Sequence, residues 1–219
     1  MTGTTRRHQP NGRNHHHDPD HHQARPAGRP RRDRRAGRPA GPAQDAKPVT
    51  IGVITTLSTP AGYIGEDVRD AIQLAVDQEG GKLGGVPVTL RVEDDTLKPA
   101  NGKQIADKMA ADGVKVVTGI IFSNVLAAVQ PSIIDAGGFY ISSNAGPSPF
   151  AGEKCNPNYF VASYQNDAFH EAAGLGANEL GYKKMAILAP NYQAGRDALE
   201  GFKRTYKGEI AGEIYTKLD

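Results

Sequence analysis

Short β-branched runs that alternate with segments of helical periodicity constrain the fold of this sequence most. Residues 49–54 are mostly apolar and β-branched, as in a strand that is buried in a parallel sheet. In residues 65–79 the apolar residues recur at helical spacing, and Gly80-Gly81 ends the predicted helix. Because this pattern then repeats, the segment predicts an α/β fold with a parallel sheet and helices on both faces.

The repeat continues to about residue 142. Further strands are expected over residues 86–92, 114–121 and 139–142. Helices are expected over residues 100–112 and around Leu126, Val129 and Ile133. In such a sheet, ligands bind beyond the carboxyl ends of the strands, so the loops after the strands are where a site is expected.

A second α/β set is expected after a segment rich in Pro, Gly and Asn, residues 143–158, which reads as an excursion between lobes. Its strands are expected over 159–162, 185–188 and 209–218, and its helices over 168–180 and 195–206. The sequence thus predicts an N-terminal lobe over 47–158 and a partial second lobe over 159–219. Because the second set contains only about half of a lobe, the chain is expected to be a fragment.

Residues 1–46 differ from the rest in composition. They hold ten Arg and four Asp, a net charge of +6, and contain no Ile, Leu, Val, Phe, Tyr or Trp. We expect them to be disordered, because they cannot offset chain entropy by burying apolar surface. The His-rich residues 15–22 and Arg-rich residues 31–35 are interpreted as low-complexity and solvated-charge segments rather than as metal or nucleic-acid sites.

The remaining residues do not have the composition of a nucleic-acid-binding domain or the motifs of a common enzyme class. They carry 16 Lys and Arg against 20 Asp and Glu, so the foldable part is acidic and no nucleic-acid partner is expected. They contain neither a dinucleotide-binding nor a phosphate-binding glycine motif, and no Gly-x-Ser-x-Gly supplies a nucleophile for His170. Asp94-Asp95 is interpreted as a strand-exit turn rather than a cation site. We therefore expect no catalysis, no cofactor and no metal.

Polar residues gather in three loops at the expected strand ends, over 55–65, 122–124 and 142–148. Two of these loops lead into helix N-termini, where free N–H groups favour an anion, so a carboxylate is the expected ligand group. Ser123 alone can equally be a plain N-cap, and Ser142–Gly146 can be a turn. Three such loops at one sheet edge favour a binding site.

Several motifs can be read along the chain: Ile51–Ile54 with Gly62-Tyr63, Gly84–Val88, Asp94-Asp95, Ser142–Ser148, Tyr164–Asp167 and Asn191–Asp197. These motifs resemble the solute-binding proteins of branched-chain amino-acid ABC transporters. They occur in order from about Lys47 to Asp219. The later motifs are similar to the subgroup associated with aromatic and other organic acids.

The resemblance implies a type I periplasmic binding fold, with two Rossmann-like lobes, parallel sheets and a ligand in the cleft between the lobes. It implies capture of an amino acid or small carboxylate, delivery to an ABC permease in the inner membrane, a periplasmic location and a monomer. A ligand-sensing domain of a signalling receptor, or an α/β enzyme whose catalytic half is missing, remain the alternatives.

The resemblance also assigns ligand-binding roles. Tyr63 corresponds to an aromatic residue of the first loop, and Ser123 to the hydroxyl that holds the ligand carboxylate. Asn144, Ala145 and Gly146 correspond to the same carboxylate pocket, mostly through their backbone, and Gly146 replaces a frequent Thr. Tyr192 and Gln193 correspond to the second-lobe loop that faces the ligand.

Finally, Ala43–Pro48 resembles the junction at which the family's signal peptide is cleaved, yet no apolar segment precedes it. Residues 1–42 are therefore expected to come from a misread frame or a wrong start.

Overall fold

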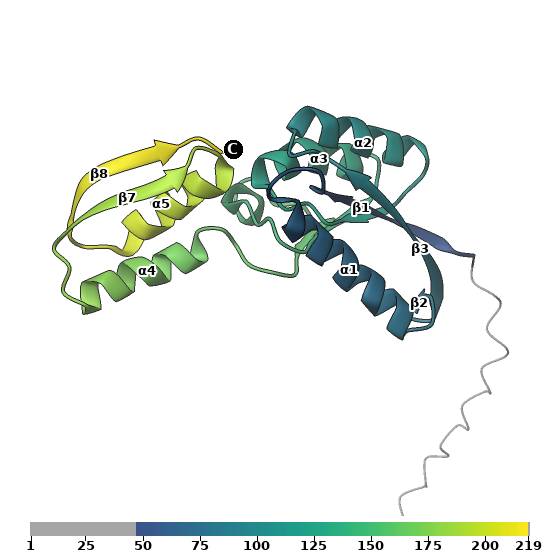
Figure 1. The fold of residues 1–219 in the computed structure, drawn as a ribbon, viewed down its shortest axis with the longest axis horizontal. Helices are drawn as coiled ribbons and strands as arrows, with labels where there is room; N and C mark the ends of the chain where they lie inside the picture. The colour runs from purple at the N-terminus through teal and green to yellow at the C-terminus, as the bar shows by residue number, and fades with distance from the viewer. Residues whose placement is uncertain (1–46, 219) are drawn as a thin grey trace, which may run out of the picture. The chain divides into compact units, whose positions relative to one another are not determined.

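The computed structural model describes residues 47–218 (Figure 1). The predictions made for residues 1–46, including disorder and the interpretation of the His- and Arg-rich segments, lie outside the described residues. The two α/β sets of the described chain are built as follows.

The first set contains a six-stranded sheet of order β2-β3-β1-β4-β5-β6. Its pairs are parallel except for β2, which is antiparallel to β3. The strands are β1 (Val49–Thr55), β2 (Lys82–Leu83), β3 (Val86–Asp94), β4 (Val116–Thr118), β5 (Phe139–Ser142) and β6 (Tyr159–Val161). The helices are α1 (Gly62–Gln78), α2 (Pro99–Ala111), α3 (Ser123–Asp135) and the 3-10 helix η1 (Ser148–Ala151).

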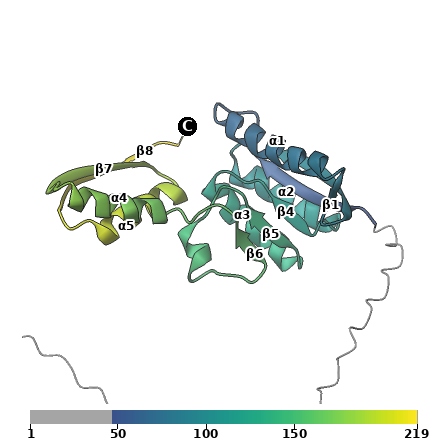
Figure 2. The ribbon, with the colours of Figure 1, turned by 90° about the horizontal axis from the view of Figure 1, so that it is seen from below.

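The direction of the crossovers sets the layers. The chain moves from β1 to β3 through α1 and then returns across β1 to β4 through α2, so right-handed connections place α1 and α2 on opposite faces (Figures 1 and 2). The next connection, from β4 to β5, crosses the sheet in the same direction, so α3 lies on the same face as α2 and packs against it. The main core, which includes Ile54, Met109 and Leu126, lies between the sheet and the α2–α3 pair.

One expected strand belongs to a different sheet than predicted. The sequence predicts that residues 159–162 open the second set, but β6 pairs in parallel with β5, with Tyr159 beside Tyr140. The two rings stack at 6.0 Å, and Phe150 of η1 packs edge-on against Tyr159 at 5.2 Å. The excursion over 143–158 therefore returns to the sheet that it left, and the chain leaves this sheet only after Val161.

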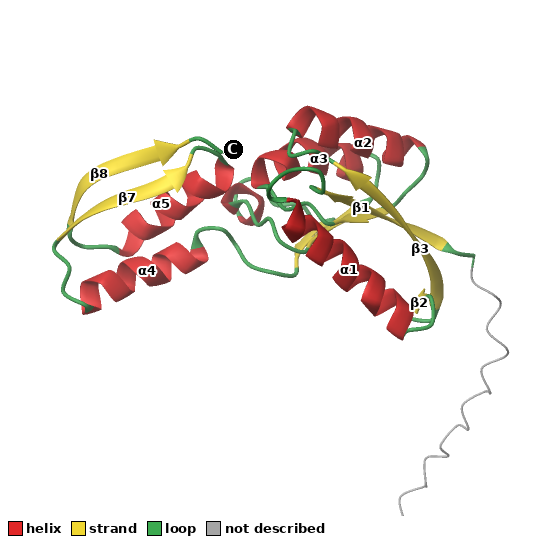
Figure 3. Cartoon of the chain, viewed as in Figure 1, coloured by secondary structure: helices red, strands yellow, loops and turns green. Residues whose placement is uncertain are grey.

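The second set contains α4 (Ala168–Glu179), β7 (Lys184–Pro190), α5 (Gln193–Thr205) and β8 (Glu209–Thr216). Strands β7 and β8 form a parallel two-stranded sheet, and α4 and α5 lie on the same side of it (Figure 3). Its small core includes Ile187, Leu199 and Phe202. These four elements match the predicted ones to within about two residues at most ends.

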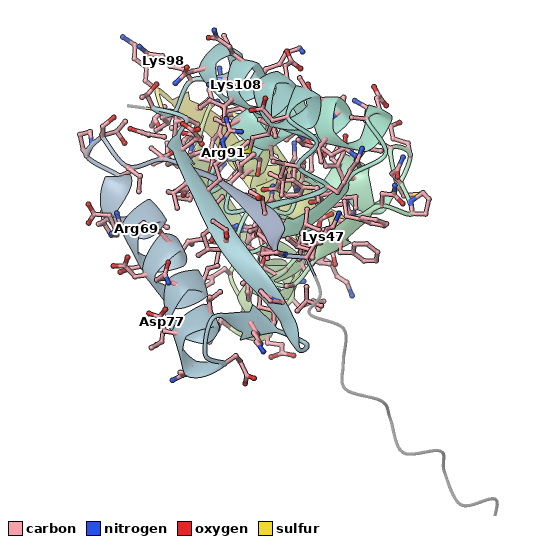
Figure 4. All side chains as sticks on the ribbon, turned by 90° about the vertical axis from the view of Figure 1, so that its right-hand side faces the viewer. Lys47, Arg69, Asp77, Arg91, Lys98 and Lys108 are labelled. Carbon is pink, nitrogen blue, oxygen red and sulfur yellow. The ribbon has the colours of Figure 1, made fainter. Side chains whose placement is uncertain are left out.

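The predicted α/β class with parallel sheets is thus confirmed, with local differences. The strand expected over 114–121 forms only over Val116–Thr118, because Gly119, at φ +102°, turns the chain out of the ladder. Charged side chains lie on the outside, among them Arg91 of β3, which pairs with Asp112 at 2.7 Å (Figure 4). No helix within residues 47–218 has the length and apolar character needed to cross a bilayer.

Candidate functional site

The loop after β3 is built around two consecutive carboxylates. Asp94 accepts hydrogen bonds from three backbone N–H groups, those of Leu57 at 2.9 Å, Ser58 at 3.1 Å and Thr96 at 2.8 Å. Partial burial opposes ionisation of Asp94, but hydrogen bonding to the Ser58 side chain and to these three N–H groups outweighs it and lowers the pKa of Asp94. The bond from Thr96 fits the predicted strand-exit turn, and the bonds from Leu57 and Ser58 join this turn to the loop that follows β1.

Asp95, on the buried side of the same loop, holds the turn over Thr96 and Leu97 by a hydrogen bond. It is fully buried, and its Oδ1 accepts hydrogen bonds from the Thr56 hydroxyl at 2.6 Å and the Leu97 N–H at 2.8 Å. Burial raises the pKa of Asp95. Thr96 and Leu97 have φ angles of 53° and 59°, a left-handed conformation that is costly for residues other than glycine. The two carboxylates thus hold a strained tip that ends in Leu97.

Leu97 lines a cavity of about 550 Å³ at the carboxyl ends of the strands. The other lining residues come from the start of α3, the β7–α5 loop and the segment at the end of β8: Asn124, Asn191, Tyr192, Tyr215, Thr216, Lys217 and Leu218. The cavity therefore lies where the strand-end argument placed a site, and its volume suits a small organic ligand.

The cavity combines groups that suit a carboxylate with an apolar or aromatic body. Lys217 supplies a cation, and Asn124, Asn191 and Thr216 supply hydrogen-bonding groups. The ring of Tyr192 packs on Phe122 at 6.2 Å. Burial raises the pKa of Tyr192, so its phenol stays protonated at neutral pH and can donate a hydrogen bond.

The structure does not support the interpretation of Ser123 as an N-cap, whereas its role in holding a ligand carboxylate stays a prediction. Ser123 is the first residue of α3, after the N-cap residue Phe122, and no side-chain cap bond is formed, so it is not an N-cap. Its side chain is 1% exposed, and its Oγ accepts a hydrogen bond from Asn166 Nδ2 at 3.0 Å. The hydroxyl thus lies behind the strand-end surface and is already engaged.

The 144–146 segment is held mainly by contacts within the protein. Asn144 donates from Nδ2 to the Ile121 carbonyl at 3.0 Å, and Ala145 is 2% exposed. The Gly146 N–H donates to Asn166 Oδ1 at 3.2 Å. A Cβ on Gly146 would lie 1.9 Å from the Tyr164 carbonyl oxygen, which explains why no side chain stands at this position.

The remaining predicted residues separate into two groups. Tyr192 lines the 550 Å³ cavity, whereas Gln193 donates from Nε2 to Asp197 Oδ1 at 2.8 Å. Tyr63 is 64% exposed on α1 and does not belong to the cavity lining. Through Asn166 and Asp197, the structure links Ser123, Gly146 and Gln193, but not Tyr63.

Sequence reasoning assigned no role to Asn166, Asp197 or Asn124. All three lie in segments that the sequence singled out, namely the motifs Tyr164–Asp167 and Asn191–Asp197 and the loop over residues 122–124. Gln193 and Asp197 are also four residues apart and therefore share a helix face. Asn166 precedes a helix in a connecting segment, where Asn is common, so the motif by itself did not assign its side chain a role.

Comparison with known families gives one match over most of the chain. A family model described as periplasmic binding protein matches residues 48–219. Among curated proteins, the Leu/Ile/Val-binding protein BraC3 of Rhizobium johnstonii is 28% identical over 178 residues, which covers 78% of this chain and 48% of that protein. The chain spans about half the length of the curated relatives that it matches.

Solved structures show the same relationship. An ABC transporter substrate-binding protein from Sphaerobacter thermophilus is 32% identical, with a TM-score of 0.69. A solute-binding protein of an ABC transporter from R. palustris, solved in complex with benzoate, is 27% identical, with a TM-score of 0.74. Each alignment covers 78% of this chain and 48% of the solved chain. The type I fold expected from the sequence motifs is thereby confirmed.

Proposed function

Because the chain belongs to the periplasmic binding protein family, we propose that it captures a small carboxylate for an ABC importer. The observation that carries this proposal is the 550 Å³ cavity at the strand ends, where Lys217 and polar side chains lie beside the ring of Tyr192. A cation with hydrogen-bond donors recognises the carboxylate, and the aromatic and apolar lining accommodates the rest of the ligand.

An aromatic acid fits this lining better than an aliphatic amino acid. Tyr192 is supported by Phe122 and offers a ring against which a planar ligand can pack. Solute-binding proteins at 26–27% identity have been solved with 3,4-dihydroxybenzoic acid and benzoate. The curated relative at 28% identity is named for Leu, Ile and Val, so a branched-chain amino acid is the second candidate.

The proposed physiology follows from the family. The protein acts in the periplasm as a monomer and delivers its ligand to a permease in the inner membrane. Of the residues predicted from the motifs, we propose that Tyr192 contacts the ligand. The loops behind the contact surface are shaped by Ser123, Asn144, Ala145, Gly146 and Gln193. Tyr63, which does not line this cavity, stays a prediction from the motifs alone.

Amide chemical-shift perturbation on the 15N-labelled full chain tests the proposed binding. We expect 4-hydroxybenzoate and benzoate at millimolar concentration to shift the amides of Asn124, Tyr192 and Thr216, because these residues line the cavity. Leucine and isoleucine in parallel titrations separate the two ligand classes.

Two controls sharpen this test. Benzyl alcohol has the ring but no carboxylate and should shift these amides much less at equal concentration. The Lys217→Met variant keeps a long side chain without the charge and should weaken the response to benzoate. A chain that responds to none of the four carboxylates contradicts the proposed function.

A further inference from the structure

Asn166 occupies a buried position at which three segments of the chain meet. Its Oδ1 accepts the Gly146 N–H at 3.2 Å, and its Nδ2 donates to Ser123 Oγ at 3.0 Å and to Asp197 Oδ2 at 2.9 Å. Its backbone N–H also donates to the Gly146 carbonyl at 2.8 Å. One side-chain amide thus joins α3, the 144–148 segment and α5, while only 7% of the residue is exposed.

Asp197 completes the connection from α5. Besides Asn166, its carboxylate accepts the Ser148 N–H at 3.1 Å and Gln193 Nε2 at 2.8 Å. All three donors are neutral, and no ion pair within residues 47–218 includes Asp197. Arg204, on the same helix, pairs instead with Asp167 and Glu171. A buried carboxylate without a cation is costly, so its donors must be held in place for it to persist.

We propose that Asn166 and Asp197 form a latch that fixes the strand-end loops of the first sheet to the first turn of α5. The latch holds Ser123 and the 146–148 turn on one side, and the turn that carries Tyr192 and Gln193 on the other. Asn166 and Asp197 are positioning residues, since neither lines the 550 Å³ cavity. Their effect on ligand binding rests on the proposed function, whereas the latch itself does not.

The chemistry of the latch explains why residue 166 is Asn. The Gly146 N–H requires an acceptor, while Asp197 requires a donor, and a side-chain amide provides both on one planar group. An Asp at this position would keep the acceptor but place a second carboxylate against Asp197. An Ala would leave the Gly146 N–H without its acceptor and take one donor from Asp197.

Amide hydrogen exchange on the ligand-free full chain tests the latch directly. In Asn166→Ala the Gly146 amide should exchange about fivefold to tenfold faster, the factor that corresponds to the loss of one hydrogen bond. In Asp197→Asn the Ser148 amide should respond in the same way. The control Asp135→Asn changes an exposed carboxylate on α3 and should leave both amides unchanged. Unchanged exchange at Gly146 and Ser148 in the folded variants would overturn the proposal.

The Asn166→Asp variant gives a second readout that simple loss of packing would not produce. Two carboxyl groups in contact resist ionising together, and the introduced carboxyl group, when protonated, can donate to Asp197 as the amide does. The melting temperature of the variant should therefore be closest to that of the wild type at low pH. The difference between the two melting temperatures should grow as the pH rises. Tyr164, His170 and Tyr192 line a 420 Å³ cavity together with Asn166, and the neighbouring Asp167 pairs with Arg204. These titratable and charged groups are the same in the variant and the wild type. A difference in melting temperature between the variant and the wild type that does not change with pH contradicts the latch.

The effect on ligand binding is measured separately with 4-hydroxybenzoate. We expect its dissociation constant to rise about fivefold in Asp197→Asn, because the turn that carries Tyr192 loses one fixed contact. If the wild-type chain does not bind this probe, the proposed function fails while the exchange experiment still decides on the latch. If the chain binds it and Asp197→Asn binds it equally well, the latch has no role in positioning the site.

Discussion

The Thr56 hydroxyl donates a hydrogen bond to Asp95 Oδ1 across 2.6 Å, and neither residue is exposed to solvent. This bond ties the end of β1 to the end of β3, two neighbouring strands that run in parallel. The same Oδ1 accepts the N–H of Leu97, which lines the candidate cavity. A buried side-chain contact between strands thus determines where one wall of the cavity lies.

We expect Asp95→Ala to lower the free energy of unfolding by about 2–4 kcal/mol, because it leaves the Thr56 hydroxyl and the Leu97 N–H buried without an acceptor. Urea denaturation measures the change. Asp112→Ala removes a carboxylate that is half exposed and pairs with Arg91, so it should cost less than about 1 kcal/mol. Equal losses in the two variants would contradict the role of Asp95.

The stability difference between Asp95→Asn and the wild type should depend on pH. Burial raises the folded-state pKa of Asp95 above its unfolded value, so ionisation of this group destabilises the wild-type fold as the pH rises through the raised pKa. The Asn variant does not ionise and should become less destabilised relative to the wild type over that range. Urea midpoints at several pH values measure this, and a constant difference would contradict the raised pKa.

Gly146→Thr should prevent normal packing or cost at least about 3 kcal/mol, because a Cβ would lie 1.9 Å from the Tyr164 carbonyl oxygen. Gly176 of α4 is a matched control because no atom lies within 4 Å of its Cβ position. Gly176→Ala should stabilise the chain by about 0.5–1 kcal/mol through helix propensity. Melting temperatures distinguish the two, and a stable Gly146→Thr would show that the 144–146 segment packs differently.

Ser123→Ala should lower the free energy of unfolding by about 1 kcal/mol, because Asn166 loses one of its hydrogen-bond acceptors. Because Ser123 is only 1% exposed, we expect the affinity for 4-hydroxybenzoate to stay within about twofold. Isothermal titration calorimetry with 4-hydroxybenzoate measures the affinity of the variant and of the wild type. A loss of about 1–3 kcal/mol in binding would instead support the direct carboxylate contact that the motifs imply.

Tyr192→Ala should weaken the binding of an aromatic acid by about 0.5–1.5 kcal/mol, the range measured for aromatic pairs. Tyr192→Phe keeps the ring that packs on Phe122 and should retain most of that affinity. The comparison is made by chemical-shift titration with benzoate. Equal affinities of the Ala variant and the wild type would exclude Tyr192 from the site.

Periodicity predicted the elements well because it reports local burial. The helical spacing of apolar residues in α2, α3 and α5, and the β-branched run of β1, follow from which side chains face the core. The sheet membership of β6 was missed because pairing with β5 depends on where the 143–158 excursion ends, and no local pattern encodes that. The ring of Phe150 that packs on Tyr159 comes from within this excursion.

The candidate site shows the same division. Strand-end loops with Ser, Asn and Tyr predicted a site at the edge of the sheet where the cavity lies, and Tyr192 lines that cavity. The motifs could not show that Ser123 and Gly146 are engaged by Asn166, because 43 residues separate Ser123 from Asn166. Asn124, which lines the cavity, belongs to the predicted strand-end loop over residues 122–124, but only Ser123 of that loop was assigned a ligand-binding role.

The sequence by itself determined the α/β class and the family, because each depends on local burial or on ordered motifs. The tertiary structure alone decided which polar groups face the cavity and which form hydrogen bonds within the protein. The reason is that a hydrogen bond between distant segments depends on the packing of the whole unit. In this chain that packing directs Asn166 and Asp197 inward, and leaves Asn124, Tyr192 and Lys217 around the cavity.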